Sequence, residues 1–288
     1  MKPELYIRSN CINAEGPVWD EKTGTFYFID VEAGKIYSHK DGNLTCWEAG
    51  EQVGCAVLRE KGGMIAALKS GLYEVDFPDG EKHFLADPES GIPGNRFNDG
   101  KVDPAGRLLA GTMALSSKAG DPPTGALYCL DTNGSVSKII PDVYLSNGLA
   151  WTADGKTLYF VDTTAQTVTR YAYDITSGTV SDPEVVIRVP ENTGHPDGMT
   201  IDEEGKLWIA LWGGSAVTRW DPKTGCMLEK YELPALNVSS CCFGGENMDT
   251  LFITTASQDT DPAEYPLAGN VFCMKPGVKG AVSYKYRG

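Results

Sequence analysis

The same two-strand unit recurs six times along this chain of 288 residues. Most copies begin with a polar residue, and each continues through a short strand and a turn that often contains glycine and ends in an apolar strand. The clearest copy covers residues 147–162, and the copy that begins at Asp197 has the same design. The other four copies begin at Glu15, Val53, Asn98 and Ser239. A hairpin of this kind cannot bury its own faces alone, so each copy needs neighbours.

A third strand follows most copies, as in residues 125–130 and 168–173, and a fourth often precedes the next loop. Six units of three to four antiparallel strands, at a period of roughly 40 to 50 residues, are typical of blades around a channel. We therefore predict an all-β fold, a six-bladed β-propeller with four-stranded antiparallel blades, as one domain over residues 1–288. Residues 4–8 and 281–286 are expected to pair in the last blade. A pair of β-sandwiches is the alternative, but sandwiches do not require the same hairpin six times.

The repeat places polar residues at equivalent positions around the channel. The first strand of a propeller blade is the innermost, so residues at its start form a ring at one mouth. This ring is expected to contain Glu15, Asn98 or Asp99, Asn147 and Asp197. Carboxylates that face one another in a cavity repel unless a positive charge lies among them. Asp, Glu and Asn oxygens favour a hard divalent cation, which predicts a central metal site.

We expect one ion, with calcium as the first candidate and zinc, manganese or magnesium as alternatives. The chain contains three histidines, too few for a zinc centre built on histidine and cysteine. The competing interpretation is local, because Asn-Gly and Asp-Gly pairs are good turn formers. On that interpretation, Pro196, Asp197 and Gly198 form a turn.

The charge of the chain limits its partners. A formal net charge of −14, without a basic stripe, argues against nucleic acid and against an anionic membrane surface. No apolar run approaches the ~18 residues of a membrane span, and the first residues lack the apolar core of a secretory signal. We expect a cytoplasmic protein, a monomer or weak homodimer, whose eight cysteines are reduced and mostly buried.

Six ordered motifs carry a family resemblance. They are AEGPVW (14–19), NRFNDGKVDPAGR (95–107), GTM (111–113), SNGLAW (146–151), PDGM (196–199) and SSCCFGG (239–245). Together they resemble the senescence marker protein/regucalcin/gluconolactonase family, from about Glu15 to the C-terminus. The resemblance implies a propeller with a divalent metal in its channel that hydrolyses sugar lactones, such as gluconolactone, to aldonic acids.

The resemblance also implies roles for single residues. The metal ligands fall on Glu15, Asn147 and Asp197, and the substrate-contacting residues on Arg96 and Asn98. Asp197 is implied to be both a ligand and the catalytic general base.

Several points stay open in the sequence. Some members of the family have a glutamate shortly after the GTMA segment, where it binds substrate hydroxyls, but residues 113–118 contain no acid. His195 is either a base, a substrate contact or a solvated turn residue, and residues 119–125 are expected to form a rim loop or lid. Two other functions remain possible: a calcium-dependent organophosphate or aryl-ester hydrolase, and a non-catalytic calcium-binding regulatory protein of the regucalcin type.

Overall fold

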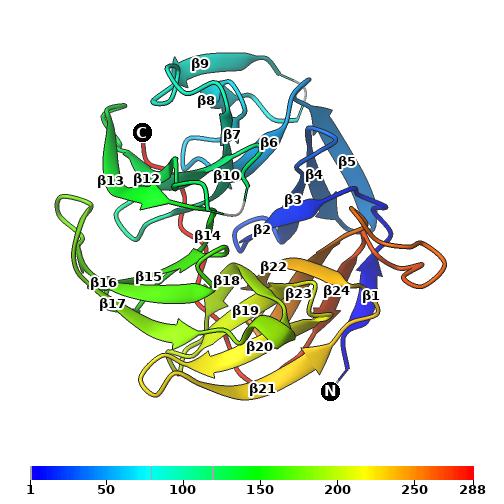
Figure 1. Ribbon diagram of the computed structural model, residues 1–288. Coiled ribbons are helices and arrows are strands. Elements are labelled where there is room, and N and C mark those ends of the chain that lie inside the picture. Colours follow the sequence, from blue (N-terminus) through cyan, green and yellow to red (C-terminus); the bar gives the residue numbers. More distant parts are fainter. Residues whose placement is uncertain (1, 79, 119) are drawn as a thin grey trace.

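The computed structural model describes residues 2–78, 80–118 and 120–288, and it is a six-bladed β-propeller (Figure 1). Each blade is a four-stranded antiparallel sheet, which confirms the predicted fold class. In the first five blades the strands follow one another in the chain, beginning with the strand at the channel. The first strands of neighbouring blades contact one another around the channel.

The strands of blades 1 to 5 have the following bounds. Blade 1 comprises β2 (Ala14–Asp20), β3 (Thr25–Asp30), β4 (Lys35–Lys40) and β5 (Asn43–Glu48). Blade 2 comprises β6 (Val53–Leu58), β7 (Met64–Leu68), β8 (Gly71–Val75) and β9 (Lys82–Ala86). Blade 3 comprises β10 (Asn95–Val102), β11 (Leu108–Ala114), β12 (Gly125–Leu130) and β13 (Val136–Val143). Blade 4 comprises β14 (Ser146–Trp151), β15 (Thr157–Asp162), β16 (Thr167–Asp174) and β17 (Thr179–Arg188). Blade 5 comprises β18 (His195–Ile201), β19 (Leu207–Trp212), β20 (Ala216–Asp221) and β21 (Cys226–Glu232).

The sixth blade closes the ring with the N-terminal strand. It comprises β22 (Asn237–Gly244), β23 (Thr250–Ala256), β24 (Val271–Met274) and, at its outer edge, β1 (Glu4–Ile7). Leu5 pairs with Phe272 in an antiparallel register. The predicted closure by the N-terminal segment is therefore confirmed.

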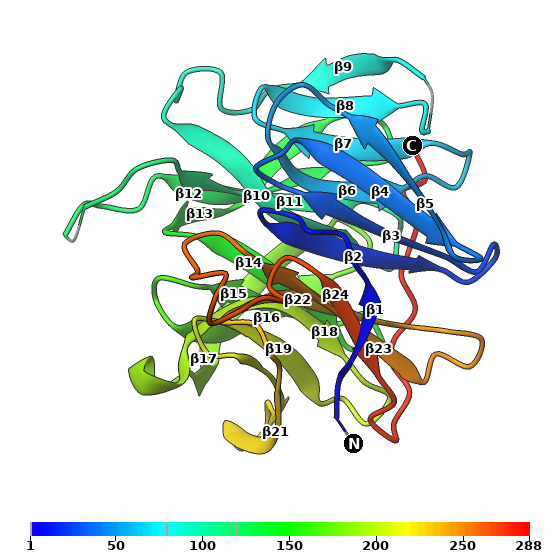
Figure 2. The ribbon, with the colours of Figure 1, turned by 90° about the vertical axis from the view of Figure 1, so that its right-hand side faces the viewer.

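The C-terminal half of that prediction is wrong. Residues 281–286 form no strand with β1 but run across one end of the channel, as the red segment of Figure 2 shows. Three anchors hold them there: the Tyr286 amide donates to the Leu58 carbonyl at 2.8 Å, the Tyr286 hydroxyl donates to the Asp131 carbonyl at 2.8 Å, and Lys285 Nζ donates to Asp20 at 2.7 Å. These contacts with blades 2, 3 and 1 hold residues 281–286 at the end of the channel, away from β1. We call residues 280–288 the C-terminal strap.

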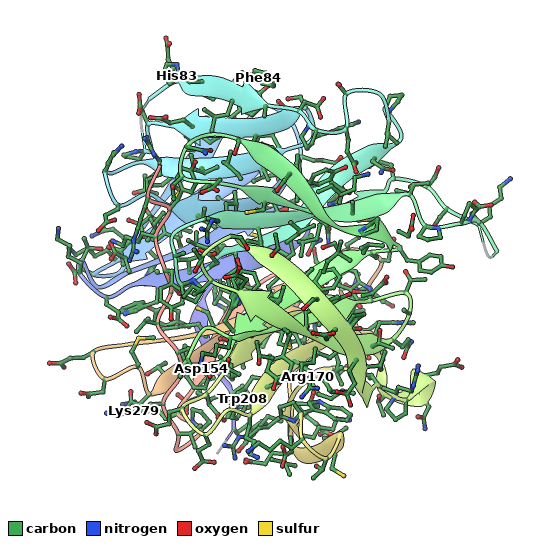
Figure 3. The ribbon with its side chains drawn as sticks, turned by 90° about the vertical axis from the view of Figure 1, so that its left-hand side faces the viewer. His83, Phe84, Asp154, Arg170, Trp208 and Lys279 are labelled. Carbon is green, nitrogen blue, oxygen red and sulfur yellow. The ribbon has the colours of Figure 1, made fainter. Side chains whose placement is uncertain are left out.

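The hydrophobic core lies between the blades. Six clusters of buried side chains each join two neighbouring blades. Trp208 of β19, for example, is fully buried and packs against Phe243 of blade 6 (Figure 3). The strands can therefore be apolar on both faces, and the channel is left to the residues that line the innermost strands.

The remaining structure is loops and turns, with one short helical turn at Glu191–Thr193 (η1). Within residues 2–78, 80–118 and 120–288, no helix has the length and apolar character needed to cross a membrane. All eight cysteines are free thiols and five of them are buried, as predicted.

Candidate metal centre in the channel

Every innermost strand has an irregularity near its start. The pairing register with the second strand shifts between Glu15 and Val18, Val53 and Cys55, Phe97 and Gly100, Ser146 and Leu149, Pro196 and Met199, and Val238 and Ser240. A β-bulge of this kind inserts an extra residue and re-aims a side chain. The sixfold sequence repeat is thus a sixfold repeat of bulges at one level of the channel.

The bulges correct one prediction. Pro196, Asp197 and Gly198 do not form a turn, because they lie inside β18 at its bulge. Asn147 and Gly148 likewise lie inside β14. The interpretation of these Asn-Gly and Asp-Gly pairs as simple turn formers is therefore wrong.

The glycines after the polar residues have a packing reason. A Cβ atom on Gly148 would lie 2.7 Å from the Asp197 carbonyl oxygen, and one on Gly198 would lie 1.9 Å from Ser240 Oγ. Real Cβ atoms do not approach other atoms so closely, so neighbouring innermost strands require glycine here.

The structure brings Glu15, Asn147 and Asp197 together at the bulges, and all three are buried. Burial raises the pKa of Asp197 well above its usual value, and the nearby carboxylates of Glu15 and Asp99 raise it further. Burial also raises the pKa of Glu15 to about 8, with Asp99 as the next cause. These carboxylates therefore lack sufficient positive charge around them. We call Glu15, Asp99, Asn147 and Asp197 the acid–amide ring.

The amide of Asn147 gives an independent indication of a ligand. Its Nδ2 donates to Thr163 Oγ1 at 3.0 Å, and that hydroxyl donates to the Pro196 carbonyl at 2.7 Å. Its Oδ1 is buried and has no hydrogen-bond partner among the described residues. A buried carbonyl oxygen without a partner is costly and needs an explanation.

The donor set fits a hard cation. In the described part of the chain no three His, Cys, Asp or Glu side chains are grouped to hold a metal. Glu15 and Asp197 instead supply carboxylate oxygens, and Asn147 supplies the unpaired amide oxygen. Oxygen donors of this kind, with water in the open positions, are what calcium and magnesium prefer.

The predicted substrate residues lie beside the ring. Arg96 Nη1 donates to the Phe97 carbonyl at 2.9 Å and to Asn98 Oδ1 at 2.7 Å, and Asn98 Nδ2 donates to the Ser146 carbonyl at 2.9 Å. Burial lowers the pKa of Arg96, whereas the carboxylates of Glu32, Glu15 and Asp197 oppose that change. The guanidinium group therefore faces the same carboxylates that form the ring.

Sequence reasoning missed Lys101. Its Nζ donates to the Met199 carbonyl at 2.6 Å, so it reaches across the channel from β10 to β18. Its charge lowers the pKa values of Glu15 and Asp99, against the larger effect of burial. The ring is thus partly balanced by a cation of the protein itself. The alternation of side chains along a strand, counted from Asp99, could have indicated Lys101.

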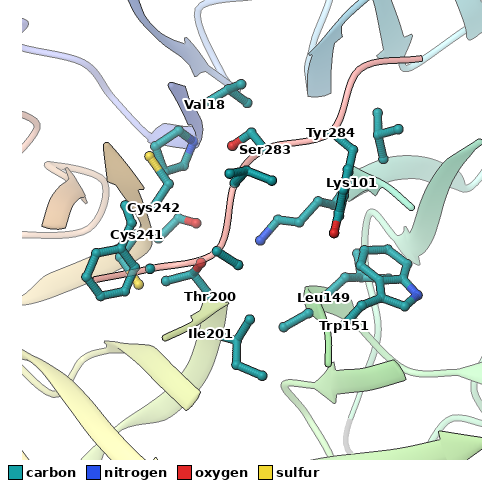
Figure 4. A pocket seen from close by; sticks show the side chains of 18 of the residues that line it. Val18, Lys101, Leu149, Trp151, Thr200, Ile201, Cys241, Cys242, Ser283 and Tyr284 are labelled. Atoms are coloured by element: carbon teal, nitrogen blue, oxygen red, sulfur yellow. The ribbon is translucent and has the colours of Figure 1, made fainter. Parts of the chain in front are cut away.

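An enclosed cavity lies beside the ring, and of the four ring residues Asp99 is the one that lines it. It has a volume of about 420 Å³ and is lined by the strand residues that follow the ring positions, such as Val18, Leu149 and Ile201. Figure 4 shows Lys101 extending into it, with Ser283 and Tyr284 of the C-terminal strap along one wall. We call this cavity the strap chamber. Its lining is mostly apolar, so the ring, where the oxygen donors meet, is the better candidate for chemistry.

The three histidines are not part of the ring. His195 is exposed, with Nδ1 2.6 Å from Gln166 Nε2, which does not support a role as base. His83 lies on β9, the outermost strand of blade 2 (Figure 3). His39 lies on β4 beside Tyr6.

The segment after β11 does not compensate for the missing acid. Residues 115–118 are exposed, and Met113 pairs directly with Arg96 across the sheet. Of the expected rim loop at 119–125, Ala119 lies outside the described residues. Residues 120–122 are exposed, and Gly125 begins β12.

The chain resembles known proteins over its whole length. The sequence profile of the SMP-30/Gluconolactonase/LRE-like region matches residues 13–257. Regucalcin of Danio rerio is 38% identical over 294 residues, which cover 100% of this chain and 99% of that protein.

Two solved structures share the fold. A calcium-binding protein, regucalcin, of Agrobacterium tumefaciens has a TM-score of 0.92 and 28% identity over 100% of this chain and 97% of its own. A luciferin-regenerating enzyme has a TM-score of 0.91 and 28% identity over 99% of both chains. This chain belongs to the SMP-30/gluconolactonase/LRE-like family.

Proposed function

We propose that this protein hydrolyses sugar lactones, such as gluconolactone, to aldonic acids, with one divalent cation held by Glu15, Asn147 and Asp197. The observation that carries the proposal is the acid–amide ring, in which two buried carboxylates lie close to Asn147, whose buried amide oxygen has no hydrogen-bond partner among the described residues. Membership of a family whose description includes gluconolactonase supports the lactone-hydrolysing class. The relative in Agrobacterium tumefaciens is named a calcium-binding protein, which supports calcium as the first candidate ion.

The reaction needs a polarised carbonyl, an activated water and a proton acceptor. A bound divalent cation supplies charge that polarises the lactone carbonyl and acidifies water. Asp197 takes the proton from the attacking water as the tetrahedral oxyanion forms. This proton then passes to the leaving group, the oxygen of the lactone ring. In the metal-free site the pKa of Asp197 is raised by burial and by Glu15 and Asp99. A bound cation would offset this repulsion and keep the carboxylate ionised, as a general base must be.

Substrate orientation falls to Arg96 and Asn98. The two side chains are joined by a hydrogen bond of 2.7 Å, and Asn98 is fixed in turn by the Ser146 carbonyl. Held in this way, Arg96 loses little conformational freedom when it binds the lactone or its hydroxyls.

The test is a substrate panel with metal-stripped protein. The protein is reconstituted with calcium, zinc, manganese or magnesium and assayed on gluconolactone, a pentonolactone, an aryl ester and a phosphotriester. We expect turnover to require a metal, to be fastest on the hydroxylated lactones and to disappear in chelator. Faster turnover of the phosphotriester or the aryl ester would reassign the site to that hydrolase class. Calcium binding without turnover of any substrate would leave the regulatory function.

A further inference from the structure

We propose that Glu32 determines substrate specificity by accepting a hydrogen bond from a hydroxyl group of the lactone. The site would then favour lactones with ring hydroxyls over unsubstituted lactones. This inference rests on the proposed lactonase function and names the substrate class of the same site.

Glu32 lies in the turn between β3 and β4, at the end of the propeller where the ring is found. The strand before this turn ends at Asp30, which pairs with Ala14, the residue before Glu15. Gln52 precedes β6 of the next blade, and its Nε2 donates to Glu32 Oε2 at 2.7 Å. The side chain of Glu32 is 29% exposed, so the carboxylate is held in place without being sealed from solvent.

A gap separates Glu32 from Arg96. Glu32 Oε1 lies 3.9 Å from Arg96 Nη2, which is too long for a direct hydrogen bond. Arg96 Nη1 is already used by Phe97 and Asn98, and Glu32 Oε2 by Gln52. Within the described residues, neither Nη2 nor Oε1 has a hydrogen-bond partner. A free donor and a free acceptor therefore face one another.

A hydroxyl group suits this gap because it can accept from Nη2 and donate to Oε1 at once. A C–H group at the same place can do neither, and it would leave both charged groups without their water. The pair is thus complementary to an alcohol and not to an alkyl ring. A site built to bind a hydroxyl discriminates strongly against the analogue that lacks it.

The position also accounts for the acid that residues 113–118 lack. Met113, the first residue of that segment, is the pairing partner of Arg96 in the neighbouring strand and brings no acid. The carboxylate near Arg96 comes instead from Glu32 of blade 1. The chain therefore binds substrate hydroxyls with an acid on a different blade.

The experiment compares kcat/KM for gluconolactone with that for δ-valerolactone, which has the same ring size and no hydroxyls. In Glu32→Ala we expect the preference for gluconolactone to fall about 10- to 100-fold, mainly through a higher KM, while δ-valerolactone is affected little. Glu32→Gln keeps an oxygen acceptor without the charge, so its preference for gluconolactone should lie between that of the unmodified protein and that of Glu32→Ala. The matched control is Glu51→Gln, because Glu51 lies nearby but is paired with Lys82 at 2.8 Å.

The outcomes separate this inference from the proposed function. If the unmodified protein with calcium opens neither lactone, the proposed function fails, and this inference fails with it. If the unmodified protein opens gluconolactone and both Glu32 variants keep its preference, only the inference is overturned. Thermal unfolding of each variant excludes a folding defect, and Glu32→Gln serves as the test if Glu32→Ala does not fold.

Discussion

The two ends of the channel are built from the same six strands but have opposite chemistry. At the level of the bulges, the strands present Glu15, Asp99, Asn147 and Asp197, which are buried and lack sufficient positive charge. Further along the same strands they present Val18, Leu149 and Ile201, and the C-terminal strap covers that end. The ring is polar with an unpaired oxygen, and the strap chamber is mostly apolar.

The difference shows that a repeat can carry a functional site at only one position of its pattern. In all six copies, the regular part of the innermost strand packs into the core. The bulge is the one position where the backbone is irregular, and a polar side chain there points into the channel with its neighbours. Changes at the ring should therefore affect chemistry, and changes at the strap should affect stability.

The largest effect is expected from Asp197→Asn. This change removes the proton acceptor and one carboxylate ligand with almost no change in volume. We expect kcat/KM on gluconolactone to fall by about 10² to 10⁴-fold, measured at saturating calcium. The matched control is Asp99→Asn, which is equally buried and belongs to the ring but has no predicted role as ligand or base. Equal losses of kcat/KM in the two variants would show that activity depends on the total charge of the acid–amide ring and not on a specific role of Asp197.

A smaller effect, confined to stability, is expected from Tyr286→Ala in the strap. Tyr286 is 4% exposed and packs in the cluster between blades 2 and 3. Its removal should lower the free energy of unfolding by about 3 kcal/mol or more, and the thermal midpoint by roughly 6–12 °C. Tyr286→Phe loses only the hydrogen bond to Asp131 and should cost about 1 kcal/mol. If the alanine variant kept its thermal midpoint and lost lactonase activity, the assignment of chemistry to the ring and of stability to the strap would be wrong.

The narrowest effect, confined to the metal-free protein, is a dependence of its stability on pH. The pKa of Glu15 is raised to about 8 from an ordinary value near 4.5, so the folded state binds more protons than the unfolded state between these values. The free energy of unfolding should therefore fall as pH rises through that window, and each kcal/mol lost lowers the thermal midpoint by roughly 2–4 °C. Calcium should reverse the loss, because it stabilises the ionised ring. Glu15→Gln should show a weaker pH dependence, and an unchanged one would contradict this cause.

The fold could be predicted because the hairpin repeat is strong and local. Six copies of one pattern leave few architectures, and the strands at 147–162 and after Asp197 are found where the repeat placed them. The strap could not be predicted in the same way. The alternation of residues 281–286 is compatible with an edge strand, and only the three-dimensional positions of Leu58, Asp131 and Asp20 decide where it binds.

The candidate site was predictable in part for the same reason. Equivalent positions of a repeat must converge, so Glu15, Asn147 and Asp197 could be grouped without a structure. Their place at bulges instead of turns could not, because a bulge depends on the partner strand. Lys101 and Glu32 were missed because neither lies at the start of an innermost strand, and their contacts join blades far apart in sequence.

The closure of the sixth blade has a consequence for how the chain is made. Strand β1 is synthesised long before its partner β24, and a contact such as that between Ser9 and Gly269 spans 260 residues. During synthesis on the ribosome the propeller is therefore an open arc, with the edge of β23 or of an earlier strand exposed until β24 emerges. Contacts of such long sequence separation form slowly. We therefore expect the pairing of β24 with β1 to form late, and a chain without its first nine residues should have a last blade of three strands, β22 to β24.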